Sequence, residues 1–383
     1  MVSNVTLLPE VNVTGDWNFT GGWNVTGGWN ETGQLTNETG DYYGDYDYYG
    51  DYSEEYERWS AAVNTMWKVM CPIVLLVGTI GNIMIILVLR RMVSDVSAFP
   101  LLFMALAVTD LVLLWVVTFP RWIGELYEVW IIDMSDAACK VMAWLEYSFA
   151  SLSAWLLTAM TAHRAMSIVF PHKMRGLRPR LVALVTIGTL TGVSFVFNSF
   201  TLHGMTTEDP ESEGSCWWNF EFEANVRPKL DWLEIVLNSF LPSVVMVVCN
   251  SLMIHAVMKS AQKAHERRSV TKPGMVSRVT VTLIVVSLAF IVLTLPYYVM
   301  QMILQRNPEL DFSGPYFFFF NIAGLMWTIN SAINFFLYII TGARFREEGK
   351  KLIPRQLSRM SRSTVRTNST SGSSCKEART TDF

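Results

Sequence analysis

The sequence predicts an all-α membrane protein, a seven-transmembrane helix bundle followed by an amphipathic eighth helix. Of its 383 residues, 51% are hydrophobic and only 16% are charged, whereas a typical soluble domain contains roughly 25% charged residues. The charges also gather in short stretches and leave long uncharged runs between them. This composition excludes an ordinary soluble enzyme and a disordered chain. Five cysteines in a chain of this length exclude a disulfide-stapled secreted scaffold.

Seven apolar runs are long enough to cross a bilayer, whose hydrocarbon core of roughly 30 Å requires about 20 mostly apolar helical residues. Five of these runs contain no charged residue, the second contains Asp110 and the third contains Glu146. Each run is longer than a buried helix of a soluble protein requires. The predicted spans are Val69–Leu89, Val96–Pro120, Val141–Ala162, Leu181–Leu202, Ile235–Val257, Val279–Leu304 and Tyr316–Ile340.

The distribution of charge predicts that the N-terminus lies outside the cell. With that orientation, the outer segments contain 7 Lys and Arg against 25 Asp and Glu, and the inner segments contain 23 Lys and Arg against 6 Asp and Glu. Basic residues gather on the cytoplasmic side of membrane proteins. The net charge of −18 outside and +17 inside therefore favours a multi-pass protein of the plasma membrane with an outer N-terminus.

Residues 1–66 contain no apolar run, and we expect them to form an outer, glycosylated, acidic tail before the bundle of residues 67–342. Met1–Glu10 lacks the basic start and apolar core of a cleavable signal peptide, so we expect the first span to act as the targeting signal. Asn-x-Thr acceptors for glycans mark a flexible outer segment. They begin at Asn4, Asn12, Asn18, Asn24, Asn30 and Asn37.

Tyrosines alternate with acids and glycines from Asp41 to Glu57, at the end of this tail. Such a strip is too charged to fold alone. Two interpretations remain open. The strip is either an anionic lure for a basic ligand, strengthened by tyrosine sulfation, or a solvated stalk.

Short motifs stand in a fixed order along the spans. The first span contains Gly81-Asn82, the second contains Leu106-Ala107-Val108-Thr109-Asp110, and the third ends near Arg164, 25 residues after Cys139. The fifth and sixth contain Pro242 and Pro296, and the seventh ends with Asn330-Ser331-Ala332-Ile333-Asn334-Phe335-Phe336-Leu337-Tyr338. In this order and spacing, the motifs resemble those of the rhodopsin-like (class A) family of G-protein-coupled receptors, from Trp67 to about Leu352.

The resemblance implies a disulfide between Cys139 and Cys216, which would pin the second outer loop over a ligand pocket. It also implies that His163, Arg164 and Tyr338 take part in coupling to a heterotrimeric G protein.

In relatives, a polar cluster around the acid of the second helix holds a sodium ion in the inactive state. The matching residues offer oxygen atoms, which suit a hard cation. A neutral, hydrogen-bonded aspartic acid is the alternative, and we expect no other cofactor. The residues of this cluster are Asp110, Ser153, Asn330, Ser331 and Asn334, with Asn82 nearby.

One face of the third span contains three polar residues. At 100° per residue, Glu146, Ser153 and Arg164 point within about 20° of the same direction. Because polar groups at membrane depth are costly unless they face protein or water, we expect this face to line the axis of the bundle. Glu146 stands where amine receptors of the family have an aspartate. It would meet either a cation of the ligand or a core partner such as Arg121 or Lys140.

The acidic outer surface favours a cationic ligand, because charge steers association. The Asn330-Ser331 pair, the acidic glycosylated tail and the Cys216-Trp217-Trp218 loop resemble peptide receptors more than amine or lipid receptors. We therefore expect a basic or amidated peptide as the extracellular ligand. The expected ligand-binding residues are Glu146, Trp217, Trp218 and Tyr297.

The chain departs from the family pattern in several motifs. His163-Arg164-Ala165 lacks the acid that, in relatives, holds the arginine in the inactive state. Thr294 replaces a tryptophan, Phe335 replaces a proline, and Asn250 stands where a tyrosine is usual. Two interpretations follow: a working receptor with raised basal signalling, or a decoy that binds ligand with little G-protein coupling.

Other functional classes lack the residues they need. The chain contains no metalloprotease, hydrolase or phosphate-loop motif and no lysine for retinal from Asp311 to Thr341. We therefore expect neither an enzyme nor an opsin, and no nucleic-acid partner. Residues 343–383 are expected to form a basic amphipathic helix and an inner tail. That tail is rich in Ser and Thr from Ser358 to Thr381, which suits phosphorylation by receptor kinases and binding of arrestin.

We hypothesise that basal signalling is elevated because His163 cannot neutralise Arg164. The variant His163→Asp restores a carboxylate beside the arginine. It should lower ligand-independent G-protein activation, measured per receptor at the cell surface. An unchanged basal signal would contradict the hypothesis.

Overall fold

The computed structural model describes residues 28–29, 35–36, 44–93, 99–174, 176, 178–210, 214–266, 278–307, 310 and 313–351. The chain divides into two compact units, Met1–Glu54 and Glu55–Phe383. In the first unit, β1 (Gly28–Trp29) pairs antiparallel with β2 (Leu35–Thr36). The six predicted glycosylation sites and the Ser/Thr-rich tail lie outside the described residues.

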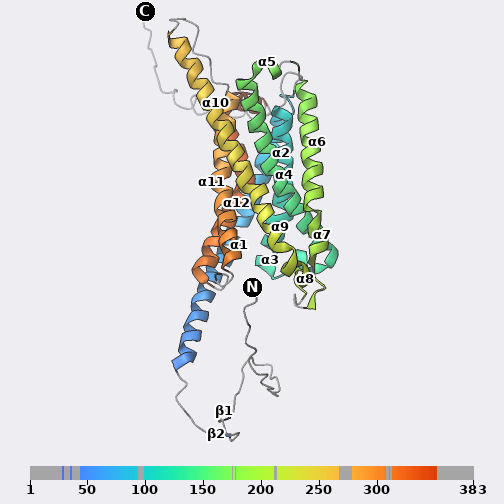
Figure 1. Ribbon diagram of the computed structural model, residues 1–383, viewed down its shortest axis with the longest axis vertical. Helices are drawn as coiled ribbons and strands as arrows, with labels where there is room; N and C mark the ends of the chain where they lie inside the picture. Colours follow the sequence, from blue (N-terminus) through green and yellow to red (C-terminus); the bar gives the residue numbers. More distant parts are fainter. Residues whose placement is uncertain are drawn as a thin grey trace, which may run out of the picture. The chain divides into compact units, whose positions relative to one another are not determined.

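The second unit is a bundle of long helices (Figure 1). Figure 1 shows α3 and α8 at one end, which we call the disulfide end, and α5 at the opposite end, which we call the arginine end. The long elements are α1 (Gly44–Leu89), α2 (Phe99–Leu113), η1 (Leu114–Thr118), α3 (Phe119–Tyr127), α4 (Asp136–Val169), α6 (Pro179–Phe197), α9 (Arg227–Ile235), η5 (Val236–Phe240), α10 (Leu241–Glu266), α11 (Arg278–Arg306) and α12 (Gly314–Thr341). The short ones are η2 (Ile131–Met134), α5 (Pro171–Met174), η3 (Asn198–Phe200), α7 (Thr201–Gly204), β3 (Met205–Thr206), β4 (Trp217–Trp218), α8 (Phe220–Asn225) and α13 (Ala343–Lys350).

Several helices extend beyond the predicted spans. The second span was expected to end at Pro120, but α3 continues to Tyr127. Pro120 lies at the start of α3, after the π-helical turn η1, where a missing N–H costs little. The fifth span was expected to begin at Ile235, but α9 begins at Arg227. The part of the Tyr-rich strip that the structure describes, from Gly44 on, is assigned to α1.

Within the described residues, six helical segments are long and apolar enough to cross a membrane, and α4 is not among them. With 34 residues, α4 is long enough, but it contains many small and hydroxyl side chains. It packs against α2, α6, α10 and α11. The buried residues include Ser148, Ser151, Ser153, Thr158 and Thr161. A helix surrounded by protein can contain such residues, which favour close helix packing in membranes.

Phe335 replaces the proline of the family motif and packs against α1. A Cβ atom added at Gly81 would lie 2.9 Å from Cβ of Phe335, and one added at Gly78 would lie 2.9 Å from Cβ of Ala332. The two glycines therefore allow α12 to approach α1 closely. After α12, the short α13 buries Phe345 against Tyr338, with ring centroids 5.9 Å apart. The amphipathic eighth helix is thus confirmed.

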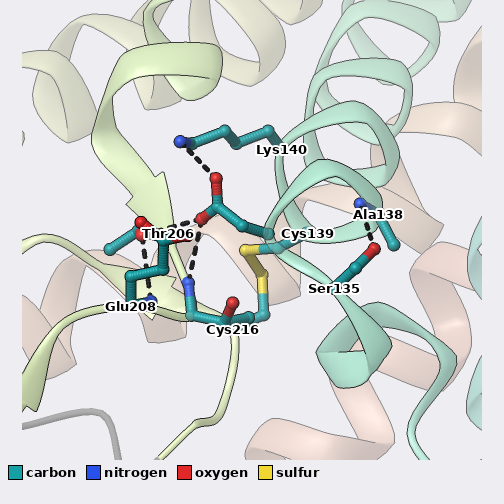
Figure 2. A network of polar contacts seen from close by, with 9 residues as sticks. Ser135, Ala138, Cys139, Lys140, Thr206, Glu208 and Cys216 are labelled. Carbon is teal, nitrogen blue, oxygen red and sulfur yellow. Dashed lines mark hydrogen bonds and ion pairs between the residues drawn. A yellow bond between two sulfur atoms is a disulfide. The ribbon is translucent and has the colours of Figure 1, made fainter.

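A covalent link and a carboxylate attach the β3–β4 hairpin to the start of α4. Cys139 and Cys216 form the disulfide that the resemblance implies, with Cα atoms 5.4 Å apart. Figure 2 shows a second connection beside it. Asp136 accepts hydrogen bonds from Nζ of Lys140 at 2.5 Å, Oγ1 of Thr206 at 2.8 Å and the backbone N–H of Thr207 at 3.2 Å. The loop is therefore fixed at two adjacent points.

The hydrogen bonds from Lys140 and Thr206 lower the pKa of Asp136 from its ordinary value. A lowered pKa in the folded state stabilises the fold above the ordinary aspartate pKa of about 3.9, and this stabilisation is lost as the pH falls through the folded pKa. Asp136→Asn should therefore lower the thermal midpoint of the purified protein by about 1–3 °C at pH 7. The difference from wild type should shrink once the pH falls below about 3.9 and through the lowered pKa of Asp136. A difference independent of pH would contradict this assignment.

Candidate functional site

Carboxylates and tyrosines gather between α4, α9 and α11 near the disulfide end. Glu146 of α4 is half-buried. The charge of Glu234 on α9 interacts with those of Glu146 and Asp231. The charges of Glu146, Glu234 and Asp231 also act on the hydroxyl of Tyr297 on α11. We call this group the acidic cluster, and its members are Glu146, Tyr147, Asp231, Glu234, Tyr297 and Tyr298.

One acid of this cluster has a basic partner. Nε of Arg227 lies 3.3 Å from Oδ2 of Asp231, and Nη1 of Arg227 donates to Glu223 at 2.6 Å. Among the described residues, neither Glu146 nor Glu234 forms an ion pair with a basic side chain. Neither carboxylate therefore has an ion-pair partner of its own, and the charge of Arg227 acts on Glu234 only at longer range. Bringing like charges together in a site of low dielectric is costly.

The two alternative partners of Glu146 are engaged elsewhere. Lys140 pairs with Asp136. The guanidinium of Arg121 lies 4.0 Å from the ring centroid of Trp67, and its Nη2 donates to Oδ1 of Asn321 at 3.1 Å. The charge of Arg121 still acts on Glu146. Arg121 thus attaches α3 to α1 and α12. Its positive charge weakens the repulsion between Glu146 and the other acids, but it forms no ion pair with Glu146.

The four residues expected to bind ligand fall into two groups. Glu146 and Tyr297 lie together in the acidic cluster, whereas the two tryptophans lie in the loop. Trp218 is only 5% exposed, because its ring stacks between Phe200 and Phe222. Trp217 is 52% exposed and lies 5.3 Å from the guanidinium of Arg227. The position of Trp218 indicates a packing role, whereas Trp217 is accessible.

The polar cluster around Asp110 occupies the centre of the bundle. Asp110 is fully buried and accepts hydrogen bonds from Nδ2 of Asn334 at 2.7 Å and Oγ of Ser153 at 3.3 Å. A cavity of about 10 Å³, with room for about one water-sized sphere, lies next to Ser153, but Asp110 itself is not among the residues that line it. Ser153, Asn330 and Ser331 line this cavity. Their oxygen atoms fit a small hard cation or a water molecule.

At the arginine end, Arg164 is bound by a hydroxyl instead of a carboxylate. Its Nε donates to Oγ1 of Thr280 at 2.8 Å, and its guanidinium lies 5.9 Å from the ring centroid of Phe99. His163 meets the same phenyl ring edge-on at 5.4 Å. Tyr338 is buried and packs against Phe103, at 4.9 Å between ring centroids. The structure therefore places the three residues that were expected to take part in coupling at the arginine end of the bundle.

Sequence reasoning assigned Glu234 and Asp231 to an outer loop and gave them no role. The spacing of the polar residues in this segment could have indicated a helix with one polar face. Asp231, Glu234 and Asn238 are three and four residues apart, which places them on one face of a helix. Thr280 was missed because a threonine in an apolar helix is ordinary, and only its neighbour in space makes it a partner of Arg164.

Comparisons with known proteins agree with this geometry. Residues 81–338 match the family described as 7 transmembrane receptor (rhodopsin family). The chain is 27% identical over 255 residues to the cysteinyl leukotriene receptor 1 of Cavia porcellus, covering 65% of this chain and 70% of that protein. It is 26% identical over 315 residues to the galanin receptor 2b of Danio rerio, covering 82% and 81%. It is 27% identical over 284 residues to the melanin-concentrating hormone receptor 1 of Macaca mulatta, covering 71% and 76%.

Proposed function

Because the chain belongs to the seven-transmembrane receptors of the rhodopsin family, and is therefore a receptor for an extracellular ligand and not an enzyme, we propose that its ligand is a basic or amidated peptide. The receptor then signals to a heterotrimeric G protein by rearranging its helices. In this proposal the disulfide end faces outward at the plasma membrane and binds the ligand, and the arginine end faces the cytoplasm. Receptor kinases and arrestin act on the tail beyond residue 351.

The observation that supports a cationic ligand is the pair Glu146 and Glu234. Their charges interact, and among the described residues neither forms an ion pair, although Arg121 acts on Glu146 and Arg227 acts on Glu234 at longer range. A guanidinium or ammonium group between them would remove the repulsion and gain attraction in a site of low dielectric. The rings of Tyr147, Tyr297 and Tyr298 would add cation–π contacts.

Ligand binding acts on the helices through differential affinity. A ligand shifts the bundle only by binding the open state better than the closed one. Glu146 and Glu234 belong to different helices. A cation bound between them therefore stabilises the state of the bundle in which both carboxylates, on α4 and α9, contact the ligand. The decoy alternative receives no support from the described residues or from the comparisons.

The first experiment measures G-protein activation in cells that express the full chain, with a library of amidated and basic peptides. A peptide that raises the signal supports the proposal. A peptide that binds or is internalised with no response, basal or evoked, would overturn the G-protein part.

For an active peptide, Glu146→Gln and Glu234→Gln should each weaken potency by about 30-fold or more, because each removes one charge of a buried pair with the ligand cation. Surface expression, measured in parallel, should change far less. Glu221→Gln is the matched control, since Glu221 is exposed on α8 at the same end, and it should leave potency within about 2-fold. Equal potency in all three variants would show that Glu146 and Glu234 do not contact the ligand cation.

The proposal also includes a sodium ion held by Asp110 with Ser153, Asn330, Ser331 and Asn334. The cavity beside Ser153 and the oxygen-rich side chains support it. The bound ion would supply a positive charge that neutralises Asp110 in the closed state. These residues orient the carboxylate whether the ion or a proton neutralises it.

Sodium should therefore stabilise the purified receptor. The thermal midpoint should rise by about 2–5 °C in sodium chloride relative to choline chloride at equal ionic strength. Asp110→Asn should abolish the difference, because it removes the charge that the ion requires. Equal midpoints for the wild-type protein in the two salts would favour the neutral aspartic acid.

A further inference from the structure

A second cavity, of about 280 Å³, lies between α1, α3 and the start of α12 near the disulfide end. We call it the α1–α3 cavity. None of the described residues that line it belongs to the acidic cluster. Pockets for drug-sized ligands measure roughly 300–1,000 Å³, so this cavity has room for a small chemical group and not for a peptide.

Four charged side chains of both signs line the α1–α3 cavity: Lys68, Arg121, Glu125 and Glu128. Glu125 is only 8% exposed, and its sole printed contact is a loose one, with Oε1 lying 3.8 Å from Nη2 of Arg121. The charge of Lys68 also acts on Glu125. Among the described residues, neither Lys68 nor Glu128 forms an ion pair. Because buried charges are normally paired and hydrogen-bonded, the carboxylate of Glu125 has capacity for a further cation.

The guanidinium of Arg121 is held in place on one side only. Nη2 of Arg121 and Nε1 of Trp67 both donate to Oδ1 of Asn321, at 3.1 and 3.0 Å, and the guanidinium lies 4.0 Å from the ring centroid of Trp67. Within the part of the chain that the structure describes, Nη1 of Arg121 forms no hydrogen bond. An oriented guanidinium with an unused donor suits a phosphate oxygen.

An aromatic wall completes the cavity. A Cβ atom added at Gly124 would lie 2.5 Å from Cε3 of Trp130, so the glycine allows this ring to lie against α3. Glu128 ends α3 in the left-handed conformation, with φ of 57°, and its N–H donates to the carbonyl oxygen of Gly124 at 2.9 Å. The ring of Phe317 on α12 also lines the cavity. Aromatic rings beside carboxylates are the usual site for quaternary ammonium groups.

The cavity lies at the level where the bilayer begins. Lys68 directly precedes Val69, the first residue of the apolar run of α1. Val69, Ile73, Leu76 and Ile80 are each at least 50% exposed, and their spacing of three and four residues places them on one strip of α1. In a membrane protein such a strip faces lipid tails, whereas lysine and tryptophan side chains reach the head groups.

We propose that the α1–α3 cavity binds the zwitterionic head group of a phospholipid from the leaflet at the disulfide end. The phosphate contacts Lys68 and Arg121. The ammonium group contacts Glu125 and Glu128 and lies against the ring of Trp130. The two signs of charge in the cavity match the two charges of this head group, whereas an anionic lipid leaves both acids without a cation. The site is separate from the peptide site of the proposed function.

The test measures lipid binding to the purified full chain in a maltoside detergent by native mass spectrometry. The probes are dioctanoylphosphatidylcholine and dioctanoylphosphatidylglycerol, which lacks the ammonium group. We expect one molecule of the phosphatidylcholine to bind about 10-fold more tightly than the phosphatidylglycerol, because the contact with a buried carboxylate is lost in the second lipid. Equal affinity for the two lipids overturns the site.

Two variants assign the two halves of the head group. Lys68→Gln should weaken binding of both lipids by about 10-fold, because both contain the phosphate. Glu125→Gln keeps the size of the side chain and should weaken only the phosphatidylcholine, again by about 10-fold. Lys229→Gln and Glu221→Gln are the matched controls, since both residues are exposed at the same end and line no part of the cavity. The controls should stay within about 2-fold of wild type, and an equal loss in all four variants overturns the assignment.

A further arm separates a lipid from a soluble ligand of the same chemistry. Phosphocholine without tails should compete with the lipid only at a concentration at least about 100-fold higher, because each buried methylene of the tails adds to the affinity. Competition at equal concentration overturns the assignment to a lipid. The measurement involves no peptide and no G protein, so its outcome is independent of the proposed function.

Discussion

The polar face of α4 is the constraint on which the rest of the bundle depends. A hydrocarbon core contains no water, so every polar group at that depth must find its partner inside the protein. Along this face Ser153 bonds to Asp110 of α2 and Arg164 bonds to Thr280 of α11. Glu146 lies near the acids and tyrosines of α9 and α11 and forms no ion pair within the described residues. Each of these contacts requires a particular neighbour at a particular level. The other helices are therefore arranged around α4, which explains why α4 is less apolar than the helices that surround it.

The two ends of the bundle are held together by different interactions. At the disulfide end, the Cys139–Cys216 bond and the carboxylate of Asp136 attach the loop hairpin, and the ring of Trp218 stacks on two phenylalanines. The same ring meets Tyr147 of the acidic cluster edge-on. At the arginine end, Thr280 of α11 bonds to Arg164, and apolar residues of the same helix lie in the main hydrophobic core. A covalent bond and a carboxylate therefore fix the loop at one end, whereas apolar packing and a hydrogen bond join the helices at the other.

The departures from the family motifs are each matched by a local partner. Phe335, in place of a proline, packs over Gly81 where a larger residue would collide. Asn250, in place of a tyrosine, bonds to Ser287. Thr294, in place of a tryptophan, lines the small cavity beside the Asp110 cluster. The bundle accommodates these substitutions, because backbone hydrogen bonds inside each helix satisfy the polar groups of the main chain whatever the side chains are.

The sequence by itself determined the fold class, the seven helices, the family and the common face of Glu146, Ser153 and Arg164, because apolar length and helical periodicity are properties of the chain alone. Several helices extend beyond the spans that it predicted, since counting apolar residues stops at the first charge. Arg121 bonds to Asn321, which lies 200 residues away in the chain, whereas Asp231 pairs with Arg227 one turn earlier on the same helix. Two further pairs could be identified only from the tertiary structure. Which hydroxyl binds Arg164, and which acid faces Glu146, depend on neighbours more than 80 residues away along the chain.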